Sequence, residues 1–459
     1  RGGATEPRRA FVLGGGVAGI AAAFGLRDRG LAVTLLESRR WLGGRAFSSR
    51  DAATGWTLDN GPHVLLGCYR AMRALLRRIG SEDRFRQDRR LSMVSRDANG
   101  EVARLSLSGL PVPLAMPLAL LRLPLSFGGR LRALRGMIAS VRGAPADWSL
   151  AEWFARRAQH GEPDAWLWRP LCRAIMNVEP ELASARDFLV TLRIAFSGSA
   201  AAAAFWVPLR PWGEIVGEPA QRALVAAGVD VRCGARVVGL ATDGARVTAI
   251  ALGTGERIDL GTADVVVSAL PWFVVKDLVP ALAGLGAMRS SPIVSAYVET
   301  AAHAPPLPDE GAVVSLVHGD PFHFVLRTPG ADARRFAMLS GGNRVFDGMA
   351  VDAIAAAARA QLERHYPGWR LDDTAIVRVR KEQHATFVAA PGGDALRVDP
   401  KQAVGGLGNL FCCGDWTQTG LPATLEGAVR SAEAVVGAAY AADPRQIVVP
   451  DQGDLVRRG

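Results

Sequence analysis

Residues 11–46 read FVLGGGVAGIAAAFGLRDRGLAVTLLESRRWLGGRA. The apolar run 11–13 predicts a buried strand, which breaks into three glycines and continues as an Ala-rich helix to about Arg29. A second apolar run, 31–36, ends in Glu37. Glycines spaced G-x-G-x-x-G between strand and helix allow a tight turn, a pyrophosphate close to the backbone and close helix packing, and an acid about 20 residues on binds a ribose hydroxyl. The order predicts a dinucleotide site made by Gly14, Gly16, Val17, Ala18, Gly19 and Glu37.

The residues after the acid indicate which dinucleotide binds. The stretch continues as E-x-x-x-x-x-G-G-R-A, which resembles the FAD-binding half of the amine oxidase and carotenoid desaturase superfamily. An NAD dehydrogenase has no reason to carry this continuation. The two glycines allow the chain to turn under the flavin, and the arginine can pair with a phosphate. The additional cofactor residues expected here are Ser38, Arg39, Gly43, Gly44 and Arg45.

A second cofactor element lies near the other end of the chain, where residues 409–428 read NLFCCGDWTQTGLPATLEGA. A strand, 410–413, is expected to lead into a loop and then a helix that opens near Pro422 to Glu426. The resemblance implies that the aspartate binds the ribityl-pyrophosphate region. It also implies that the helix N-terminus faces the pyrimidine side of the flavin, where a positive helix end stabilises an anionic reduced ring. The residues concerned are Gly414, Asp415, Thr424, Leu425 and Glu426.

Two cofactor elements nearly 400 residues apart predict one discontinuous domain and make FAD the expected cofactor. The fold class expected is α/β, with a discontinuous Rossmann-type FAD-binding domain and a second α+β substrate domain of the amine oxidase and phytoene desaturase type. The strand near Val237 resembles the one whose backbone brackets the adenine. The FAD-binding domain is expected over 1–100, 215–274 and 401–445, and the substrate domain over 101–214 and 275–400.

Composition sets limits on the function. With 459 residues, 49% hydrophobic and 21% charged, the chain can fold as two interwoven globular domains. The five cysteines show neither a C-x-x-C pair nor metal-ligand spacing, so no metal site is expected. We expect these cysteines to be reduced thiols in a cytoplasmic protein. No signal peptide is visible. The net charge of +10 suggests an anionic partner, but no nucleic-acid-binding module is present.

One segment points to a membrane surface. Residues 105–142 are very apolar at first and then form a predicted amphipathic helix that carries several arginines. Four prolines make a spanning helix implausible, so an interfacial patch or the wall of a lipid tunnel fits better. A buried pair of substrate-domain helices is the alternative. The protein is therefore expected in the cytoplasm, with peripheral attachment to the inner face of the cell membrane as one reading.

Over most of its length the chain resembles the hydroxysqualene dehydroxylase family, FAD-dependent, hopanoid-associated relatives of the phytoene desaturases. The resemblance rests on residues 59–69 (DNGPHVLLGCY), on 168–171 (WRPL) with Asn177, on Pro208-Leu209 before Trp212, and on the C-terminal motif. It extends the expected flavin contacts to Gly61, Pro62 and His63. Pro62 departs from the family pattern, which is expected to have glutamine there, so an amide contact at this position is in doubt.

The resemblance implies reductive removal of the allylic hydroxyl of hydroxysqualene to give squalene. Acid-assisted loss of water leaves a cation, and hydride comes from reduced FAD. The electron donor is not identified by the sequence. His63 is the first candidate for the proton donor, and Tyr69 and Asn177 are further catalytic candidates. Asp59 reads better as a carboxylate that orders a loop. The weaker candidates are Glu179, Glu181, His323 and His384.

Three other functions stay open from the sequence. A carotenoid desaturase would use the same fold in the oxidising direction. An amine oxidase would need an aromatic cage beside the flavin, for which four tyrosines and the Leu-Pro-Ala sequence at 421–423 offer little support. The third is a flavin- or lipid-binding protein without catalysis.

Overall fold

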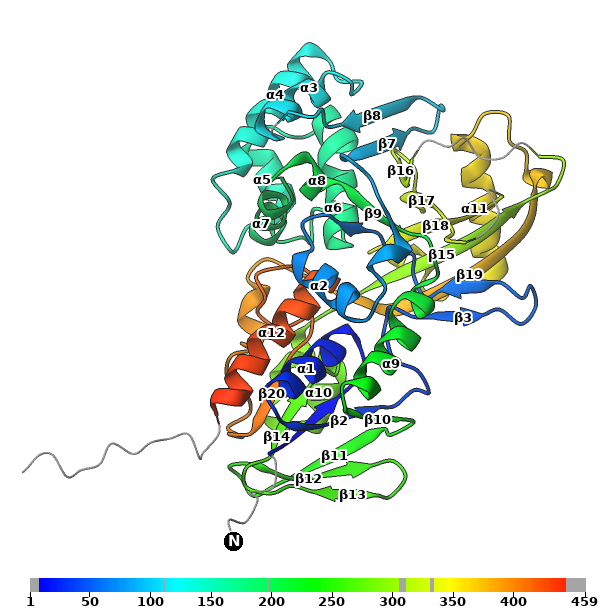
Figure 1. The fold of residues 1–459 in the computed structure, drawn as a ribbon. Helices are drawn as coiled ribbons and strands as arrows, with labels where there is room; N and C mark the ends of the chain where they lie inside the picture. The colour runs from blue at the N-terminus through cyan, green and yellow to red at the C-terminus, as the bar shows by residue number, and fades with distance from the viewer. Residues whose placement is uncertain (1–7, 111, 197, 305–310, 331–333, 443–459) are drawn as a thin grey trace, which may run out of the picture.

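The computed structural model describes residues 8–110, 112–196, 198–304, 311–330 and 334–442. The predicted domain ends at residues 1 and 445 lie outside these ranges. Figure 1 shows two layered parts, with the N-terminal βαβ unit in the lower part and helices α3 and α4 at the far tip of the upper part.

The lower part is built on a five-stranded parallel sheet in the order β10-β2-β1-β14-β20. Four distant stretches of the chain supply its strands, as a discontinuous Rossmann-type fold requires. The predicted first strand and helix form, with shifts of one to two residues at their ends. The strands are β1 (Arg9–Leu13), β2 (Ala32–Glu37), β10 (Asp230–Cys233), β14 (Val265–Ser268) and β20 (Leu410–Cys412).

Alternating strand residues bury both faces of this sheet. Ala10 and Val12 pack with the helices on one face, whereas Phe11 and Leu13 belong to the cluster that includes the antiparallel strands on the other. This agrees with the apolar, non-alternating character of buried parallel strands. The helices are α1 (Val17–Asp28), α9 (Glu218–Ala226) and α12 (Leu425–Ala441), with α2 (Arg70–Arg78) and α10 (Trp272–Leu278) at the edge; the antiparallel strands are β11 (Val237–Thr242), β12 (Val247–Leu252) and β13 (Arg257–Asp259).

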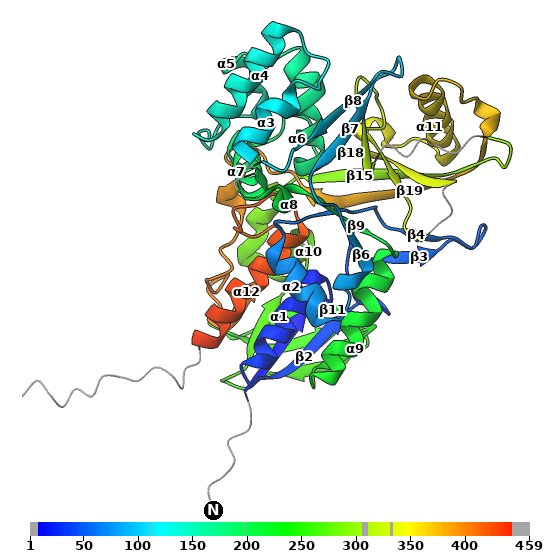
Figure 2. The same cartoon turned by 45° about the horizontal axis from the view of Figure 1, so that its top comes forward.

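The upper part contains a seven-stranded sheet in the order β19-β15-β18-β17-β16-β7-β8. Strands β7 and β8 form a hairpin across residue 100, so the predicted domain boundary at that residue is wrong for this sheet. Figure 2 shows α11 packed on the sheet and the long strands β15 and β19 running back toward the lower part. The elements are β7 (Ser92–Arg96), β8 (Val102–Ser106), β15 (Ser290–Thr300), β16 (Val313–Leu316), β17 (Phe324–Arg327), β18 (Arg335–Gly341), β19 (Thr374–Phe387) and α11 (Val351–His365).

Helices fill the rest of the upper part, and short strands link the two parts. Helices α3 (Val112–Leu120) and α4 (Phe127–Ser140) form the tip, above α5 (Leu150–Arg156), α6 (Arg169–Met176), α7 (Ala185–Phe196) and α8 (Ala200–Ala203). The short strands are β3 (Ser48–Arg50), β4 (Thr57–Asp59), β5 (Leu65–Leu66), β6 (Phe85–Gln87) and β9 (Phe205–Pro208). Within the described ranges, every helix is too short or too polar to cross a bilayer.

Candidate active site

The first glycine turn has the geometry of a phosphate site. Gly14 has a φ of 101°, which favours glycine, and a side-chain carbon on Gly19 would lie 1.9 Å from the Gly14 carbonyl oxygen. Gly16 caps α1 without a side-chain acceptor, and no acid lies in the first turn. The N–H groups of Val17 and Ala18 therefore point out of the helix end with no intrahelical partner, ready to donate to a phosphate.

The second glycine pair completes a backbone cradle against the first. Gly43 N–H donates to the Gly15 carbonyl at 2.8 Å, and Gly43 forms a bridge with Gly16. A side-chain carbon on Gly44 would lie 2.9 Å from Gly16 Cα, whereas one on Gly16 would meet nothing closer than 3.8 Å. The space beside Gly16 is therefore open because this residue is glycine, and a larger residue at position 16 would fill it with its side chain. This cradle fits a pyrophosphate.

The acid at the end of β2 is buried and held in place by backbone donors. Glu37 accepts from Gly15 N–H at 2.7 Å and from Arg39 N–H at 2.8 Å, and the Ser38 hydroxyl donates to it at 3.1 Å. Oε1 accepts both the Ser38 and Arg39 donors, whereas Oε2 accepts only Gly15 N–H and keeps a lone pair for a ribose hydroxyl. Ala235 N–H donates to the Glu37 carbonyl at 2.8 Å, which brings the strand that begins at Val237 beside the acid, where an adenosine would lie.

Arg45 lies in the same cradle but already has a carboxylate partner. Its guanidinium is 2.6 Å from buried Asp415 and donates to the Ala385 carbonyl at 2.7 Å. The two predicted cofactor residues Arg45 and Asp415 are therefore joined across 370 residues. The ion pair links the glycine loop to the C-terminal motif and leaves the remaining guanidinium N–H groups for another acceptor.

Helix α12 begins three residues later than its earliest expected start. Thr424 is the N-cap, its hydroxyl accepts from Gly427 N–H at 3.0 Å, and the first helical residue is Leu425. Pro422 therefore precedes the helix instead of lying in its first turn. Gly414 N–H donates to the Ser431 hydroxyl at 2.8 Å, which ties the Gly-Asp turn to the same helix.

Glu426 has a different role from the predicted cofactor contact. Its two carboxylate oxygens accept from Ala71 N–H at 3.3 Å and Met72 N–H at 3.0 Å, and Arg430 lies 2.8 Å away. Ala71 and Met72 are at the N-terminus of α2, so this buried acid caps a neighbouring helix. The N-cap residue of α2 is Tyr69, whose side chain does not accept from these N–H groups, so Glu426 takes the place of a local capping side chain.

His63 follows the predicted flavin loop and packs edge-on against the buried Trp212, with ring centroids 5.7 Å apart. Its Nδ1 is buried with no hydrogen-bond partner among the described residues. Burial lowers the pKa of His63 to about 4, so the ring is neutral at pH 7. A neutral imidazole can donate or accept a hydrogen bond, but it is not the cationic acid that the sequence suggested.

The other two predicted catalytic residues are held by their surroundings. Tyr69 precedes α2 and packs partly against the core of the lower part, and burial raises the pKa of its hydroxyl. Asn177 ends α6 with a φ of 52°, and its amide donates to the hydroxyls of Ser291 at 3.1 Å and Thr386 at 2.9 Å. Asn177 thus fastens α6 to β15 and β19 with both amide hydrogens.

Asp59 orders a loop, as expected. Its carboxylate accepts from the Ser48 hydroxyl at 2.6 Å and from the backbone N–H of Trp212 at 2.8 Å. Burial raises the pKa of Asp59 to about 6. The adjacent thiols Cys412 and Cys413 are buried at the end of β20, and burial raises the pKa of Cys412 to about 12. Neither thiol is in a position to act as a thiolate.

The end of β19 reaches the cradle, and of its residues the sequence analysis named only His384, as a weaker catalytic candidate. Asn60, next to the predicted flavin contact Gly61, donates to Glu382 at 2.9 Å, and Arg45 touches Ala385. His384 lies between them in sequence, hydrogen bonds to the Ser290 hydroxyl at 2.6 Å and stacks on Phe273, with centroids 4.3 Å apart. A lone Glu or His in an alternating strand carries no signal of its own, so only the sheet could bring these groups to the site.

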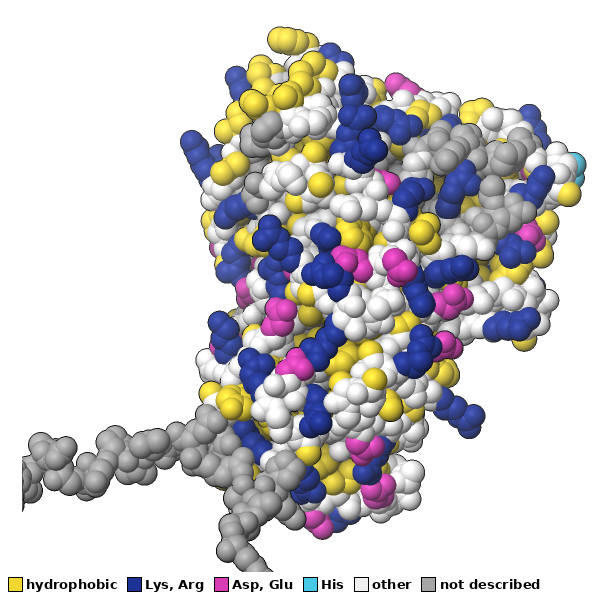
Figure 3. All heavy atoms as spheres, in the orientation of Figure 1, with side chains coloured by type: hydrophobic (Ala, Val, Ile, Leu, Met, Phe, Trp, Pro, Cys, Tyr) yellow, Lys and Arg dark blue, Asp and Glu magenta, His cyan; other side chains and the backbone are white. Residues whose placement is uncertain are grey.

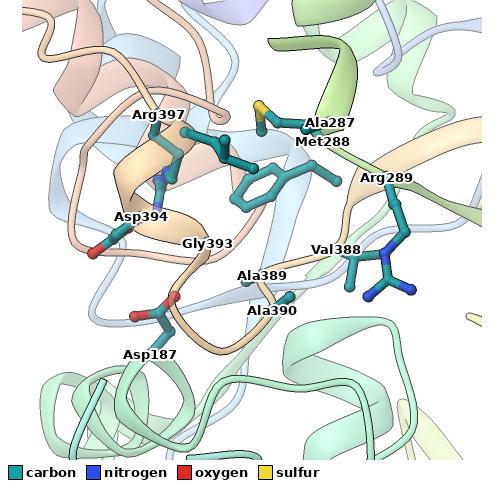
Figure 4. A pocket seen from close by; sticks show the side chains of 12 residues that line it. Asp187, Ala287, Met288, Arg289, Val388, Ala389, Ala390, Gly393, Asp394 and Arg397 are labelled. Carbon is teal, nitrogen blue, oxygen red and sulfur yellow. Dashed lines mark hydrogen bonds and ion pairs between the residues drawn. The ribbon is translucent and has the colours of Figure 1, made fainter. Parts of the chain in front are cut away.

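Arg397 is a second residue that the sequence did not single out. This buried guanidinium donates to the carbonyls of Trp416 at 3.2 Å and Leu421 at 2.9 Å, and it pairs with Asp394 at 2.9 Å. It thereby fixes the shape of the loop between Asp415 and Thr424. Figure 4 shows Arg397 and Asp394 on one wall of a hollow whose opposite side carries Met288 and Val388.

Comparisons with known proteins agree with this geometry. Residues 17–439 match the model of a family described as flavin containing amine oxidoreductase. The chain is 32% identical to hydroxysqualene dehydroxylase of Rhodopseudomonas palustris over 92% of this chain and 95% of that protein. It is 29% identical to the protein of the same name from Sinorhizobium fredii, over 93% and 96%. The fold superposes on a crystal structure of an oxidoreductase from Methanosarcina mazei with a TM-score of 0.73 at 14% identity, over 94% of this chain and 100% of that one.

The expected fold class and cofactor are confirmed by these matches. FAD is the cofactor that the glycine cradle, the ribose-binding acid and the positive end of α12 suit, and bound FAD supplies hydride transfer. The protein is a flavin-dependent oxidoreductase, and within the part of the chain that the structure describes, no group of three acidic, His or Cys side chains is placed to hold a metal. The chain belongs to the flavin containing amine oxidoreductase family, and in sequence it is similar to the hydroxysqualene dehydroxylases over nine-tenths of its length.

Proposed function

We propose that this protein reduces hydroxysqualene to squalene, with loss of the allylic hydroxyl as water. The observation that carries the proposal is the similarity to curated hydroxysqualene dehydroxylases along nearly the whole of both chains. The reaction balances as one hydride and one proton added to the alcohol, with squalene and water as products. The hydride comes from the reduced cofactor, and the chain must supply the proton and exclude water from the cation.

The interior of the molecule suits an apolar substrate. One buried apolar cluster contains Met116 and Leu120 of α3 at the tip and extends to Trp272 and Trp416 beside the cradle. Trp416 donates through its indole N–H to the Leu270 carbonyl at 3.0 Å, so its ring is fixed next to the Gly-Asp turn. An allylic cation formed beside such aromatic and aliphatic walls is shielded from water and stabilised by ring faces.

We propose that His384, and not His63, gives the proton to the leaving hydroxyl. His384 is exposed on the edge of β19 next to the cradle, and its backbone N–H donates to Glu382 at 3.1 Å. The imidazole hydrogen bonds to the Ser290 hydroxyl at 2.6 Å and stacks on Phe273, so the ring is held in place, and a positioned imidazole is the most common general acid. His63, with its lowered pKa, would then orient the cofactor or substrate by hydrogen bonding in its neutral form.

The test is a single turnover with the flavoprotein reduced chemically under anaerobic conditions, which removes the need for the physiological donor. We expect hydroxysqualene to reoxidise the flavin and squalene to appear in equal amount, as measured by absorbance and mass spectrometry. If hydroxysqualene leaves the flavin reduced while the oxidised protein desaturates a phytoene-type chain, the protein is a carotenoid desaturase and the proposal is wrong.

A further inference from the structure

The tip of the upper part is formed by helices α3 and α4, whose large apolar side chains point outward. On α3 and the residue after it, Leu114, Leu118 and Leu121 follow the i, i+4, i+7 spacing of one helix face, and they are 60%, 49% and 57% exposed. A stripe at this spacing normally faces a core. Here it faces solvent.

Helix α4 and the residue after it repeat the arrangement over a longer stretch. Phe127 is 82% exposed, Ile138 61% and Val141 68%, all on the face that also carries Leu131. The opposite face is made of small residues: a side-chain carbon on Gly129 would lie 2.2 Å from Glu162, and one on Gly136 would lie 2.3 Å from Gln159. The helix therefore packs on the protein through these small residues, with Leu134 and Met137 partly buried at its sides, and exposes four large apolar side chains.

The two stripes gather much of the exposed apolar surface in one place. Eight of the 17 large hydrophobic side chains exposed among the described residues lie between residues 110 and 141. Figure 3 shows them as a yellow cap at the top of the molecule, with dark blue side chains beside it. We call this surface the apolar cap: Leu110, Leu114, Leu118, Leu121, Phe127, Leu131, Ile138 and Val141.

The segment that forms the apolar cap carries charges of one sign. Residues 102–146 contain six arginines and neither aspartate nor glutamate. Arg122, Arg135 and Arg142 are exposed, and none of the ion pairs found among the described residues involves them. The acid packed against this helix pair is Glu162, which accepts from the Ser126 N–H and hydroxyl at 3.0 and 2.7 Å. The cap thus combines apolar side chains with unneutralised positive charge.

We infer that the apolar cap docks this protein on the surface of a membrane that contains anionic lipid. Apolar side chains enter the boundary between headgroups and acyl chains, while the arginines meet lipid phosphates. Helices of 9 and 14 residues are too short to span a bilayer and suit shallow insertion. A second copy of the chain fits less well, because a two-fold contact would set the arginines of one cap against those of the other.

The inference rests on the surface alone and does not depend on hydroxysqualene being the substrate. The test is co-sedimentation of the purified flavoprotein with vesicles, without substrate. We expect binding to vesicles made of equal parts phosphatidylglycerol and phosphatidylcholine. Binding to phosphatidylcholine alone should be much weaker, and 1 M salt should reduce binding because the Debye length falls to about 3 Å.

Two cap variants separate the apolar and electrostatic contributions. Phe127→Ser/Ile138→Ser/Val141→Ser should bind anionic vesicles at least about 10-fold more weakly. Arg135→Glu/Arg142→Glu should lose at least about 30-fold, since each charge near the surface contributes substantially. The controls are Val225→Ser/Val345→Ser/Val351→Ser and Arg222→Glu/Arg257→Glu, which change exposed side chains away from the tip and should bind like the parent.

Three results would overturn the inference. The first is a parent protein that does not sediment with anionic vesicles. The second is equal binding by the cap variants and their controls. The third is a parent dimer in light scattering that the apolar cap variant converts to a monomer, which would make the cap an interface between copies of this chain. Flavin content and circular dichroism of each variant establish that it is folded.

Discussion

Helices α1 and α4 are both rich in small and apolar residues, yet they use them in opposite ways. Helix α1 buries its apolar side chains against the sheet and α12; its Gly19 lies against the Gly14 backbone and its Gly25 against the Val436 side chain of α12. Helix α4 turns Gly129, Ala133 and Gly136 inward and exposes Phe127 and Ile138. The comparison shows that apolar periodicity identifies one face of a helix but does not show whether protein or solvent covers that face. It also shows that a helical glycine can make room either for a bound ligand or for a neighbouring segment of the protein.

The same contrast extends to the two halves of the site. The cradle for FAD is built from backbone groups on local turns, whereas the substrate side depends on side chains that the long strands of the upper sheet carry to it. Changes to the cradle should therefore affect cofactor binding, and changes to β19 should affect chemistry with the cofactor in place.

The largest expected effect tests the backbone half. Gly19→Ala places a carbon 1.9 Å from the Gly14 carbonyl oxygen, so the turn must open and FAD affinity should fall by on the order of 100-fold or more. The ratio of flavin to protein after purification measures the loss. Gly437→Ala in α12 is the control, because its new carbon meets nothing within 4 Å. Equal flavin content in both variants would show that the cradle is not the cofactor site.

The next effect tests the side-chain half. His384→Ala should keep its flavin but reduce hydroxysqualene on the order of 100-fold more slowly, the range expected for loss of a general acid. His63→Ala is the matched comparison, with a loss within about 10-fold. If His63→Ala causes the larger loss, the donor has been assigned to the wrong histidine.

A smaller effect concerns the loop that joins the halves. Burial raises the pKa of Asp59 to about 6, above the value near 3.9 of an unfolded chain, so the folded state binds more protons between pH 4 and 6. This group therefore costs stability as pH rises through that window, by up to about 3 kcal/mol. Asp59→Asn keeps an acceptor for Ser48 and Trp212 N–H and removes the cost.

The measurement is urea unfolding of parent and Asp59→Asn at a series of pH values. The gain of the variant over the parent should grow from pH 4 to pH 7 and then level off. His63 opposes this trend in the parent, because its lowered pKa makes stability fall as pH drops from about 6.5 to 4. The difference between the two proteins isolates Asp59. A gain that does not change with pH would contradict the shift.

The smallest effect tests the two faces of α4 directly. Ile138→Ser, on the exposed face, should change the free energy of unfolding by less than about 0.5 kcal/mol. Ala133→Leu, on the fully buried face, should destabilise by about 1–3 kcal/mol because added methylenes have no room. Thermal or urea unfolding of both variants measures these changes in the free energy of unfolding. A large cost for Ile138→Ser would mean that the stripe is packed in solution.

The sequence by itself determined the nucleotide half. Gly14, Gly16 and Gly19 act through local turns, and Glu37 follows at the end of the next strand, so a short stretch of chain contains the whole signal. The start of the C-terminal helix between Pro422 and Glu426 was predicted for the same reason, because the signals that begin a helix lie within a few residues of one another. Membership of the family and the cofactor followed from these local patterns.

Only the tertiary structure decided the rest. Only the structure shows that α2 donates to both carboxylate oxygens of Glu426, and that the amide of Asn177 donates to β15 and β19. Glu382, His384 and Arg397 became part of the site through contacts with residues that are distant in sequence or lie in other elements. The physical reason is that a side chain acquires its partner, its pKa and its exposure from what packs against it, and the sequence pattern of one element does not contain that information.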